Sequence, residues 1–287
     1  MTRQGIFKGL RNLLLGLAAL AIAAYLGVLS YLYVNQRTIL YANRAEIETP
    51  AIKGLPIEDV RIKTPDGETL QAWYEPPRPG QPVFLFLHGQ GAALELGKWR
   101  YIRMHKQGVG YLALAYRGFS QSTGTPSEKG LETDVLTAYD WLRAKGFRDQ
   151  DIVIHGHSLG TGVATWLATQ RPARAVILEA PFTAASDVGA EEYPYVPVAL
   201  LMTDKFLNRD RIKDVHIPVL IAHGDKDSVI PFAQGERLYA LANKPKAFVR
   251  MNGSEHNTLT RDGVYTYYWK FLNLPETDVD PALVIGK

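Results

Sequence analysis

Residues 151–160 read Asp-Ile-Val-Ile-His-Gly-His-Ser-Leu-Gly, an apolar run that ends in the pattern Gly-x-Ser-x-Gly. The residues that follow, up to Gln170, have the apolar spacing of a helix. A serine between a buried strand and a helix, flanked by glycines that permit a sharp turn, is a typical position for a reactive nucleophile. We therefore predict that Ser158 is a nucleophile at the carboxyl end of a strand.

A serine hydroxyl is a weak nucleophile until a base removes its proton, so a histidine is expected beside Ser158. After a serine in this strand-to-helix context, the acid and then the histidine follow along the chain. His256 fits the last place, because the loop at 253–257 follows an apolar run at 247–251. We predict that His256 is the general base.

Three acidic residues could orient this histidine. Asp225 and Asp227 lie in the loop at 223–231, directly after the apolar run at 218–222, and Glu179 follows another apolar run. Aspartate is also common in turns, where its side chain bonds to nearby backbone. The residues alone leave the choice among the three open.

An acyl-transfer site also needs N–H groups that stabilise the developing oxyanion. One is expected from the residue after the nucleophile, which is Leu159. A second is expected from the loop after an earlier strand. The apolar run at 83–87 leads into His88-Gly89-Gln90-Gly91, which can present the N–H of Gln90. We predict an oxyanion hole formed by these two backbone groups.

Apolar runs and helix-period segments alternate along most of the chain. Uniformly apolar runs are typical of strands buried on both faces, and their alternation with helices predicts a mostly parallel sheet covered on both sides. A hairpin pattern around Pro65-Asp66-Gly67 precedes them. The predicted fold class is therefore α/β, with ligands at the carboxyl ends of the strands. The expected strands are 59–63, 69–75, 83–87, 111–116, 151–154, 174–178, 218–222 and 247–251, and the expected helices are 128–145, 158–170 and 232–242.

Composition excludes several classes of site. The 32 Lys and Arg against 29 Asp and Glu give a net charge of only +3, which offers no strongly basic face for nucleic acid. The chain has no cysteine, so disulfides, thiolate metal sites and a cysteine nucleophile are excluded. None of the seven histidines shows the His-Glu-x-x-His spacing of a zinc site. We expect no metal, no other cofactor and no nucleic-acid partner.

One segment near the N-terminus has the length and composition of a membrane span. Residues 13–34 are almost all apolar, and a helix of this length crosses a hydrocarbon core of roughly 30 Å. Arg3, Lys8 and Arg11 precede the segment, and three tyrosines lie near its far end, as membrane interfaces favour. We predict an uncleaved signal-anchor. The alternative is a cleaved signal peptide, because Ala21-Ile22-Ala23 resembles a signal-peptidase site.

The chain is thus expected to have two parts. Residues 1–36 form an N-terminal tail and a single-pass transmembrane anchor, and residues 37–287 form the α/β domain. An insertion at about 181–216 interrupts the alternation of strands and helices and can form a small cap. With the short basic tail on the cytoplasmic side, the α/β domain is expected on the extracytoplasmic side of the membrane.

Several stretches, taken together, resemble a known family over about residues 40–271. The chain resembles the alpha/beta-hydrolase superfamily, and within it the membrane-anchored proteins of the serine aminopeptidase-like or lysophospholipase-like group. The stretches that carry the resemblance are Thr64-Pro65-Asp66-Gly67 with Trp73 and Pro76-Pro77, His88-Gly89, Tyr116-Arg117-Gly118-Phe119-Ser120-Gln121-Ser122, Pro126-Ser127-Glu128 with Gly130-Leu131 and Asp134, Gly156 to Gly160, Glu179-Ala180-Pro181-Phe182, and His223 to Pro231.

The resemblance implies an alpha/beta-hydrolase fold and a triad of Ser158, Asp227 and His256. The family pattern His-Gly-x-x-Asp places its acid four residues after His223, which selects Asp227 among the candidates. The resemblance also favours the two backbone oxyanion donors already named.

The expected reaction is acyl transfer to water by a serine hydrolase that cleaves a carboxylic ester or a thioester through an acyl-enzyme. A membrane tether raises the local concentration of lipid substrates, so an acyl or lipid-like small molecule is the expected partner. The apolar residues of the cap insertion could line the acyl pocket, or they could simply close the core. The residues considered for this pocket are Tyr193, Tyr195, Leu201 and Phe206.

Two other functions stay open. A peptidase that releases N-terminal residues could bind the substrate ammonium group at Glu191 and Glu192, although such a pair is commonly a solvated surface feature. A catalytically idle, membrane-anchored interaction module could also keep this fold, because fold alone does not prove activity. The sequence does not indicate an oligomeric state.

Overall fold

The computed structural model of the protein describes residues 3–42, 52, 54–91 and 94–275. Residues 1–2 of the predicted tail and residues 276–287 of the predicted α/β domain lie outside this described part. Eight strands form one sheet in the order β1-β2-β4-β3-β5-β6-β7-β8. The strands are β1 (Glu58–Lys63), β2 (Thr69–Glu75), β3 (Val83–Leu87), β4 (Gly110–Leu114), β5 (Ile152–His157), β6 (Ala175–Glu179), β7 (Val219–Gly224) and β8 (Lys246–Met251).

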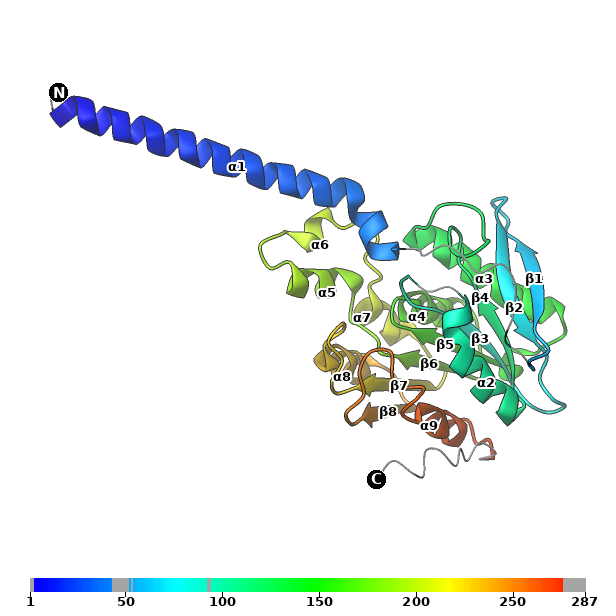
Figure 1. Cartoon of the computed structure of the whole chain (residues 1–287). Coiled ribbons are helices and arrows are strands. Elements are labelled where there is room, and N and C mark those ends of the chain that lie inside the picture. Colours follow the sequence, from blue (N-terminus) through cyan, green and yellow to red (C-terminus); the bar gives the residue numbers. More distant parts are fainter. Residues whose placement is uncertain (1–2, 43–51, 53, 92–93, 276–287) are drawn as a thin grey trace.

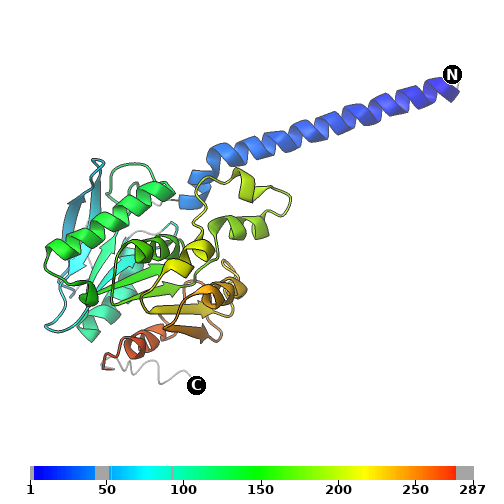
Figure 2. The same ribbon diagram turned by 180° about the vertical axis from the view of Figure 1, so that it is seen from behind.

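Helices cover both faces of this sheet (Figures 1 and 2), as the alternation of apolar runs and helical segments predicts. Helices α3, α4 and α8 lie on one face, and α2 and α9 lie on the other. The helices of the α/β domain are α2 (Lys98–Gln107), α3 (Glu128–Ala144), α4 (Gly160–Gln170), α5 (Ala185–Glu192), α6 (Val198–Leu201), α7 (Asn208–Arg211), α8 (Phe232–Leu241) and α9 (Val264–Phe271), with short 3-10 turns η1 (Leu94–Gly97), η2 (Asp149–Asp151) and η3 (Ile212–Asp214).

The central strands form where the sequence has uniformly apolar runs. All residues of β3, β4, β5, β6 and β7 are buried, because helices cover both faces of these strands. Local signals set the helix ends as well. The side chain of Ser127 accepts a hydrogen bond of 3.1 Å from the N–H of Gly130 and caps the start of α3.

Strands β3 to β8 pair with one another in parallel, whereas β2 pairs antiparallel with both of its neighbours, β1 and β4. The register aligns the carboxyl ends of the strands, since His157 pairs with Glu179 and Glu179 with Ala222. The loops after β3, β5, β7 and β8 therefore meet at one edge of the sheet.

Helix α1 (Arg3–Tyr41) contains the predicted membrane span and is longer than the predicted anchor at 1–36. Among the described residues it is the one helix that is long and apolar enough to cross a membrane, with a mean hydropathy of 2.3 in its most apolar window. It projects away from the sheet, with its N-terminal end far from the domain (Figure 1). Its last residue, Tyr41, is buried, and the Tyr41 carbonyl accepts a 3.2 Å hydrogen bond from Gly91. The anchor helix is thus rooted directly in the α/β domain.

The segment between β6 and β7 holds α5, α6, α7 and η3. In both views α5 and α6 stand beside the domain end of α1, over the carboxyl edge of the sheet (Figures 1 and 2). We call α5, α6 and the residues between them, 185–201, the cap.

Candidate active site

Ser158 lies in the sharp turn between β5 and α4. Its φ of +54° is in the left-handed region, where a residue with a side chain is strained. A side chain at Gly156 would place its Cβ 2.5 Å from the carbonyl oxygen of Gly160, and one at Gly160 would place its Cβ 2.1 Å from that of Leu87. Both glycines of the Gly-x-Ser-x-Gly pattern are therefore required by the close approach of β3, β5 and α4.

We expect Gly160→Ala to lower the free energy of unfolding by about 3 kcal/mol or more, because the new Cβ would overlap a backbone carbonyl oxygen that cannot change rotamer. Gly189→Ala is a matched control, since its Cβ would meet only a methyl group of Val198, at 3.0 Å. Thermal unfolding of the purified full-length proteins in one detergent measures both changes. Equal melting temperatures for the two variants would contradict the close approach at Gly160.

Ser158, His256 and Asp227 are brought together by the loops after β5, β8 and β7. Oγ of Ser158 lies 2.9 Å from Nε2 of His256, and Nδ1 of His256 lies 2.7 Å from Oδ2 of Asp227. A carboxylate only accepts hydrogen bonds, so Nδ1 carries the proton and Nε2 is left to accept one from the serine hydroxyl. Each of the three residues is less than 10% exposed. This chain of two hydrogen bonds is the arrangement needed to activate a serine.

The Asp227 carboxylate is held from several sides. Its Oδ1 accepts the N–H groups of Val229 at 2.9 Å and Ile230 at 2.8 Å. Nε2 of His223 lies 3.2 Å from Oδ2. Burial alone would raise the pKa of the Asp227 carboxyl, but the hydrogen bonds from His223 and His256 outweigh it and hold the pKa below its usual value. Asp227 is therefore charged and fixed in orientation beside His256.

The other two acidic candidates are engaged elsewhere. Asp225 accepts hydrogen bonds from Arg250 at 3.1 Å and from the N–H of Gly253 at 2.7 Å. Glu179 forms two bonds of 2.6 Å with Arg100 and lies within the core. Burial would raise the pKa of Glu179, but the Arg100 charge holds it well below its usual value. In the described part of the chain, neither acid forms a hydrogen bond with His256.

His157 supports the loop that carries His256. Its Nε2 lies 3.3 Å from the carbonyl oxygen of His256, and its ring centroid lies 5.2 Å from that of His256. Burial, reinforced by the Arg100 charge, lowers the pKa of His157 to about 3, so the ring is neutral near pH 7. A neutral His157 can donate a hydrogen bond to this carbonyl without placing a positive charge beside the His256 ring.

The two predicted oxyanion donors lie in segments that flank Ser158. Leu159 follows the serine directly, and a Cβ on Gly89 would stand only 3.0 Å from Cβ of Ser158, so the backbone before Gln90 touches the serine. Within the described residues the N–H groups of Gln90 and Leu159 form no hydrogen bond. The side chain of Gln90 donates a 2.6 Å bond to the carbonyl of Ile39, at the end of α1. Both N–H groups are therefore free to bind an oxyanion.

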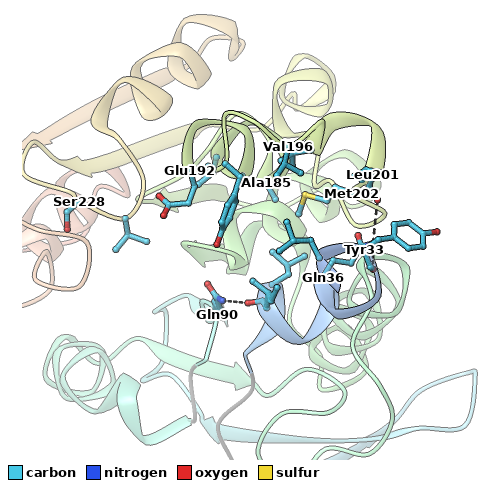
Figure 3. A pocket seen from close by; sticks show the side chains of 17 residues that line it. Tyr33, Gln36, Gln90, Ala185, Glu192, Val196, Leu201, Met202 and Ser228 are labelled. Atoms are coloured by element: carbon cyan, nitrogen blue, oxygen red, sulfur yellow. Dashed lines mark hydrogen bonds between the residues drawn. The ribbon is translucent and has the colours of Figure 1, made fainter. Parts of the chain in front are cut away.

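A cavity of about 590 Å³ opens at Ser158 and His256. Its walls include the apolar Leu96 and Trp99 and the polar Asn257 and Arg261. A second cavity of about 370 Å³ lies between α1 and the cap (Figure 3). We call the first the catalytic cavity and the second the anchor cavity.

Two of the four residues considered for the substrate pocket, Tyr193 and Leu201, line the anchor cavity. The other two line neither of these cavities. Tyr195 is 87% exposed, and its backbone carbonyl accepts a 2.7 Å hydrogen bond from the hydroxyl of Tyr25. Phe206 is fully buried, and a Cβ on Gly162 would lie 2.6 Å from its ring, so it packs in the core against α4.

The sequence reasoning missed several residues around the two cavities. Trp99 and Arg100 on α2 line the catalytic cavity, and residues from Leu32 to Leu40 of α1 line the anchor cavity. The composition of residues 13–34 indicates a membrane span. It gives no sign that the C-terminal end of the same helix also lines a cavity. The contact of His223 with Asp227 could have been expected from the sequence, because both residues belong to the pattern His-Gly-x-x-Asp.

The side chains of the described residues include no group of three or more His, Asp or Glu that could hold a metal ion. His155 and His157, which flank Gly156, point to separate partners. His155 contacts Glu179 at 3.3 Å, whereas His157 contacts the backbone of His256.

Comparison with known proteins shows the family of the chain. The family model for the alpha/beta hydrolase fold matches residues 82–208. An uncharacterised protein of Mycobacterium tuberculosis is 36% identical over 235 residues, which cover 80% of this chain and 84% of that protein. The lysophosphatidylserine lipase ABHD12 of Rattus norvegicus is 37% identical over 201 residues, which cover 62% of this chain and half of the lipase.

Solved structures resemble the fold at lower identity. An alpha-beta hydrolase from Vibrio vulnificus matches with a TM-score of 0.70 and 24% identity, covering 84% of this chain and 92% of that chain. An esterase from Exiguobacterium antarcticum matches with a TM-score of 0.61 and 18% identity, covering 75% of this chain and all of that chain. The chain therefore belongs to the alpha/beta hydrolase superfamily, and the lipase relative and the esterase neighbour indicate an enzyme of the hydrolase class.

Proposed function

We propose that the protein is a serine hydrolase that cleaves a carboxylic ester or thioester of an acyl chain, with Ser158 as nucleophile, His256 as base and Asp227 as orienting acid. The observation that carries the proposal is the pair of hydrogen bonds, 2.9 Å and 2.7 Å, that connects the three side chains. The strained turn at Ser158 and the two free N–H groups beside it support the same roles.

The reaction follows from these positions. Nε2 of His256 takes the proton of Ser158 as Oγ attacks the carbonyl carbon, and the N–H groups of Gln90 and Leu159 stabilise the oxyanion. The intermediate collapses to an acyl-enzyme while the imidazolium donates its proton to the leaving oxygen or sulfur. Water then attacks the acyl group with His256 as base, releasing the carboxylic acid and returning a proton to Oγ.

The proposed substrate is a lipid-like ester, with a lysophospholipid as the leading example. The similarity to a lysophosphatidylserine lipase supports this class of substrate, although the match spans only half of that lipase. The anchor helix supports it as well, because a tethered domain stays close to membrane lipids.

The peptidase alternative has less support. Glu191 accepts a 2.9 Å hydrogen bond from Gln234 and lies 3.4 Å from Arg237, so its charge is already partnered. Glu192 borders the anchor cavity, whose other walls are mostly apolar. A substrate ammonium group would thus meet one exposed carboxylate in an apolar setting.

A fluorophosphonate probe tests the proposed nucleophile. We expect the full-length wild type to be labelled at Ser158, with labelling and p-nitrophenyl butyrate hydrolysis both absent in Ser158→Ala. Ser228→Ala is the matched control, since Ser228 is exposed nearby but forms no hydrogen bond with His256 among the described residues. Labelling of Ser158→Ala at another serine, identified by mass spectrometry, would refute the assignment.

We propose further that residues 1–36 are tail and anchor, that residues 37–287 are the hydrolase domain with its cap, and that this domain lies on the extracytoplasmic side. The short basic tail before the span supports this orientation. Because the chain lacks cysteine, Glu236→Cys at an exposed position of α8 creates a single thiol. A membrane-impermeant maleimide should label it in intact cells, and labelling only after lysis would reverse the orientation.

A further inference from the structure

The anchor cavity is built partly from the membrane helix itself. Leu32, Ile39 and Leu40 of α1 form one wall, and Val198 and Met202 belong to the opposite wall, at and just after α6. Figure 3 shows the cap residues facing the end of α1 across this space. The polar exceptions on its walls include Glu192 and Ser228, both of which are exposed. A long apolar surface with few polar groups suits a hydrocarbon chain.

The anchor cavity and the catalytic cavity share two lining residues, Gln90 and Val229. Gln90 belongs to the loop that touches Ser158, and Val229 follows the proposed acid Asp227 by two residues. The two cavities are therefore neighbours across the catalytic loops. The catalytic cavity also carries polar side chains such as Asn257 and Arg261, so of the two spaces the anchor cavity is the better site for an acyl chain.

Polar contacts fix α1 against the segment that contains the cap. The Gln36 side-chain oxygen accepts bonds from the N–H and the hydroxyl of Thr203, at 2.7 and 3.0 Å. Arg37 pairs with Asp204 at 2.8 Å, and the Asp204 side chain is only 7% exposed. These contacts hold the two walls of the anchor cavity together.

The cap also reaches far along the membrane helix. The Tyr25 hydroxyl donates a hydrogen bond to the Tyr195 carbonyl. Along the axis of α1, Tyr25 lies about 17 Å from Gln36, on its N-terminal side. Tyr195 and Leu200 of the cap are 87% and 80% exposed. Large exposed apolar side chains beside an apolar span are suited to contact lipid rather than water. The cap therefore lies beside the C-terminal half of the apolar segment 13–34, next to the part of α1 that lines the anchor cavity.

We propose that the end of α1 is one wall of the acyl-chain site, and that the substrate is a membrane lipid ester whose single acyl chain passes from the bilayer between α1 and the cap. This inference rests on the proposed function. In this arrangement the acyl chain of the substrate lies in the anchor cavity and its ester carbonyl lies at Ser158, beside Gln90. The polar head group of the substrate lies in the catalytic cavity.

Bulky substitutions on α1 test this arrangement in the full-length protein reconstituted in phosphatidylcholine nanodiscs. Leu32→Trp and Ile39→Trp fill the anchor cavity from its helix wall. We expect the ratio of kcat/KM for p-nitrophenyl palmitate to that for p-nitrophenyl butyrate to fall about tenfold. Val34→Trp is the matched control, because Val34 is 77% exposed on the same helix and does not line the cavity. Its ratio should equal that of the wild type.

The outcomes separate this inference from the proposed function. An unchanged ratio in Leu32→Trp and Ile39→Trp, with hydrolysis still dependent on Ser158, would overturn the acyl-chain site and leave the serine hydrolase standing. An equal fall in Val34→Trp would also overturn it, because the effect would then come from the membrane. Hydrolysis that persists in Ser158→Ala would instead refute the proposed function.

A covalent probe gives a readout that does not depend on the variants. A long-chain alkyl fluorophosphonate with a diazirine at the chain end should phosphonylate Ser158 with loss of fluoride. Illumination should then crosslink the chain end to α1 or to the cap, as mass spectrometry of the digested protein would record. Crosslinks confined to α2 and Leu96, on the wall of the catalytic cavity, would place the acyl chain there and overturn the inference.

Discussion

Asp227→Asn is expected to reduce kcat for p-nitrophenyl butyrate by about 10⁴-fold, because the amide would impose the wrong tautomer on His256. The N–H groups of Val229 and Ile230 both donate to Oδ1 of Asp227, so the amide oxygen of the variant would stay on their side. The amide NH₂ would then face Nδ1 of His256 and force this nitrogen to accept. Nε2 would carry the proton and could no longer receive one from Ser158.

Asp225→Asn is the matched control, since Asp225 lies in the same loop and is an acidic candidate of the same residue type. It bonds to Arg250 and Gly253 instead, and we expect its kcat to change less than about threefold. Steady-state kinetics of the three full-length proteins at pH 8 would decide between the acids. A large loss in Asp225→Asn with near-normal turnover in Asp227→Asn would reverse the assignment.

Arg100→Ala is expected to destabilise the protein by about 3–5 kcal/mol, because it leaves the Glu179 carboxylate buried without its positive partner. The side chain of Glu179 is 0% exposed, and its other contacts are the Tyr268 hydroxyl at 2.9 Å and His155 at 3.3 Å. In a domain of this size, such a loss lowers the melting temperature by roughly 10 °C. Thermal unfolding of the full-length protein in detergent measures it.

Two further variants sharpen this test. Arg171→Ala removes an exposed ion pair with Asp140 and should cost less than about 1 kcal/mol. Arg100→Met combined with Glu179→Gln removes both buried charges and should recover much of the stability. A double variant no more stable than Arg100→Ala would show that packing, rather than the unpaired charge, causes the loss.

The same ion pair makes stability depend on pH. The folded-state pKa of Glu179 lies below the ordinary value of 4.5, so its charge contributes fully above that value. The contribution is lost as the pH falls through the lower folded-state pKa. The difference in melting temperature between wild type and Arg100→Ala should therefore shrink below about pH 4.5.

The sheet could be predicted closely from sequence because its central strands are buried on both faces. The run 83–87 coincides with β3, and the run 151–154 lies within three residues of the ends of β5. Burial on both faces leaves a short, uniform apolar run, and its length of about five residues with turn residues on both sides favours a strand over a helix. The strand-to-helix turn at Ser158 could also be recognised from sequence, because the two glycines beside the serine are needed where β3, β5 and α4 approach closely.

The residues that depend on contacts between distant segments could not be predicted in this way. Residue type and loop position alone leave Asp225 and Asp227 equal, and in sequence only the family pattern His-Gly-x-x-Asp selects Asp227, which lies beside His256 in the structure. An aromatic side chain such as Phe206 fits an apolar pocket as well as a core. Its contact with α4 shows that it packs in the core. The cavity wall on α1 was hidden because an apolar helix has the same pattern whether it faces lipid or a substrate.

The unbroken helix from Arg3 to Tyr41 fixes the distance between the membrane span and the site at Ser158. Tyr41 is buried in the α/β domain and bonds to Gly91, so membrane span and domain are joined through continuous helix. A flexible stalk would let the reactive serine sweep a volume of water above the bilayer. A continuous helix instead keeps Ser158 at one distance from the bilayer. The enzyme then meets its substrate only by diffusion in the plane of the membrane. With the proposed lipid ester as substrate, we expect hydrolysis only of lipids in the leaflet on the side of the α/β domain.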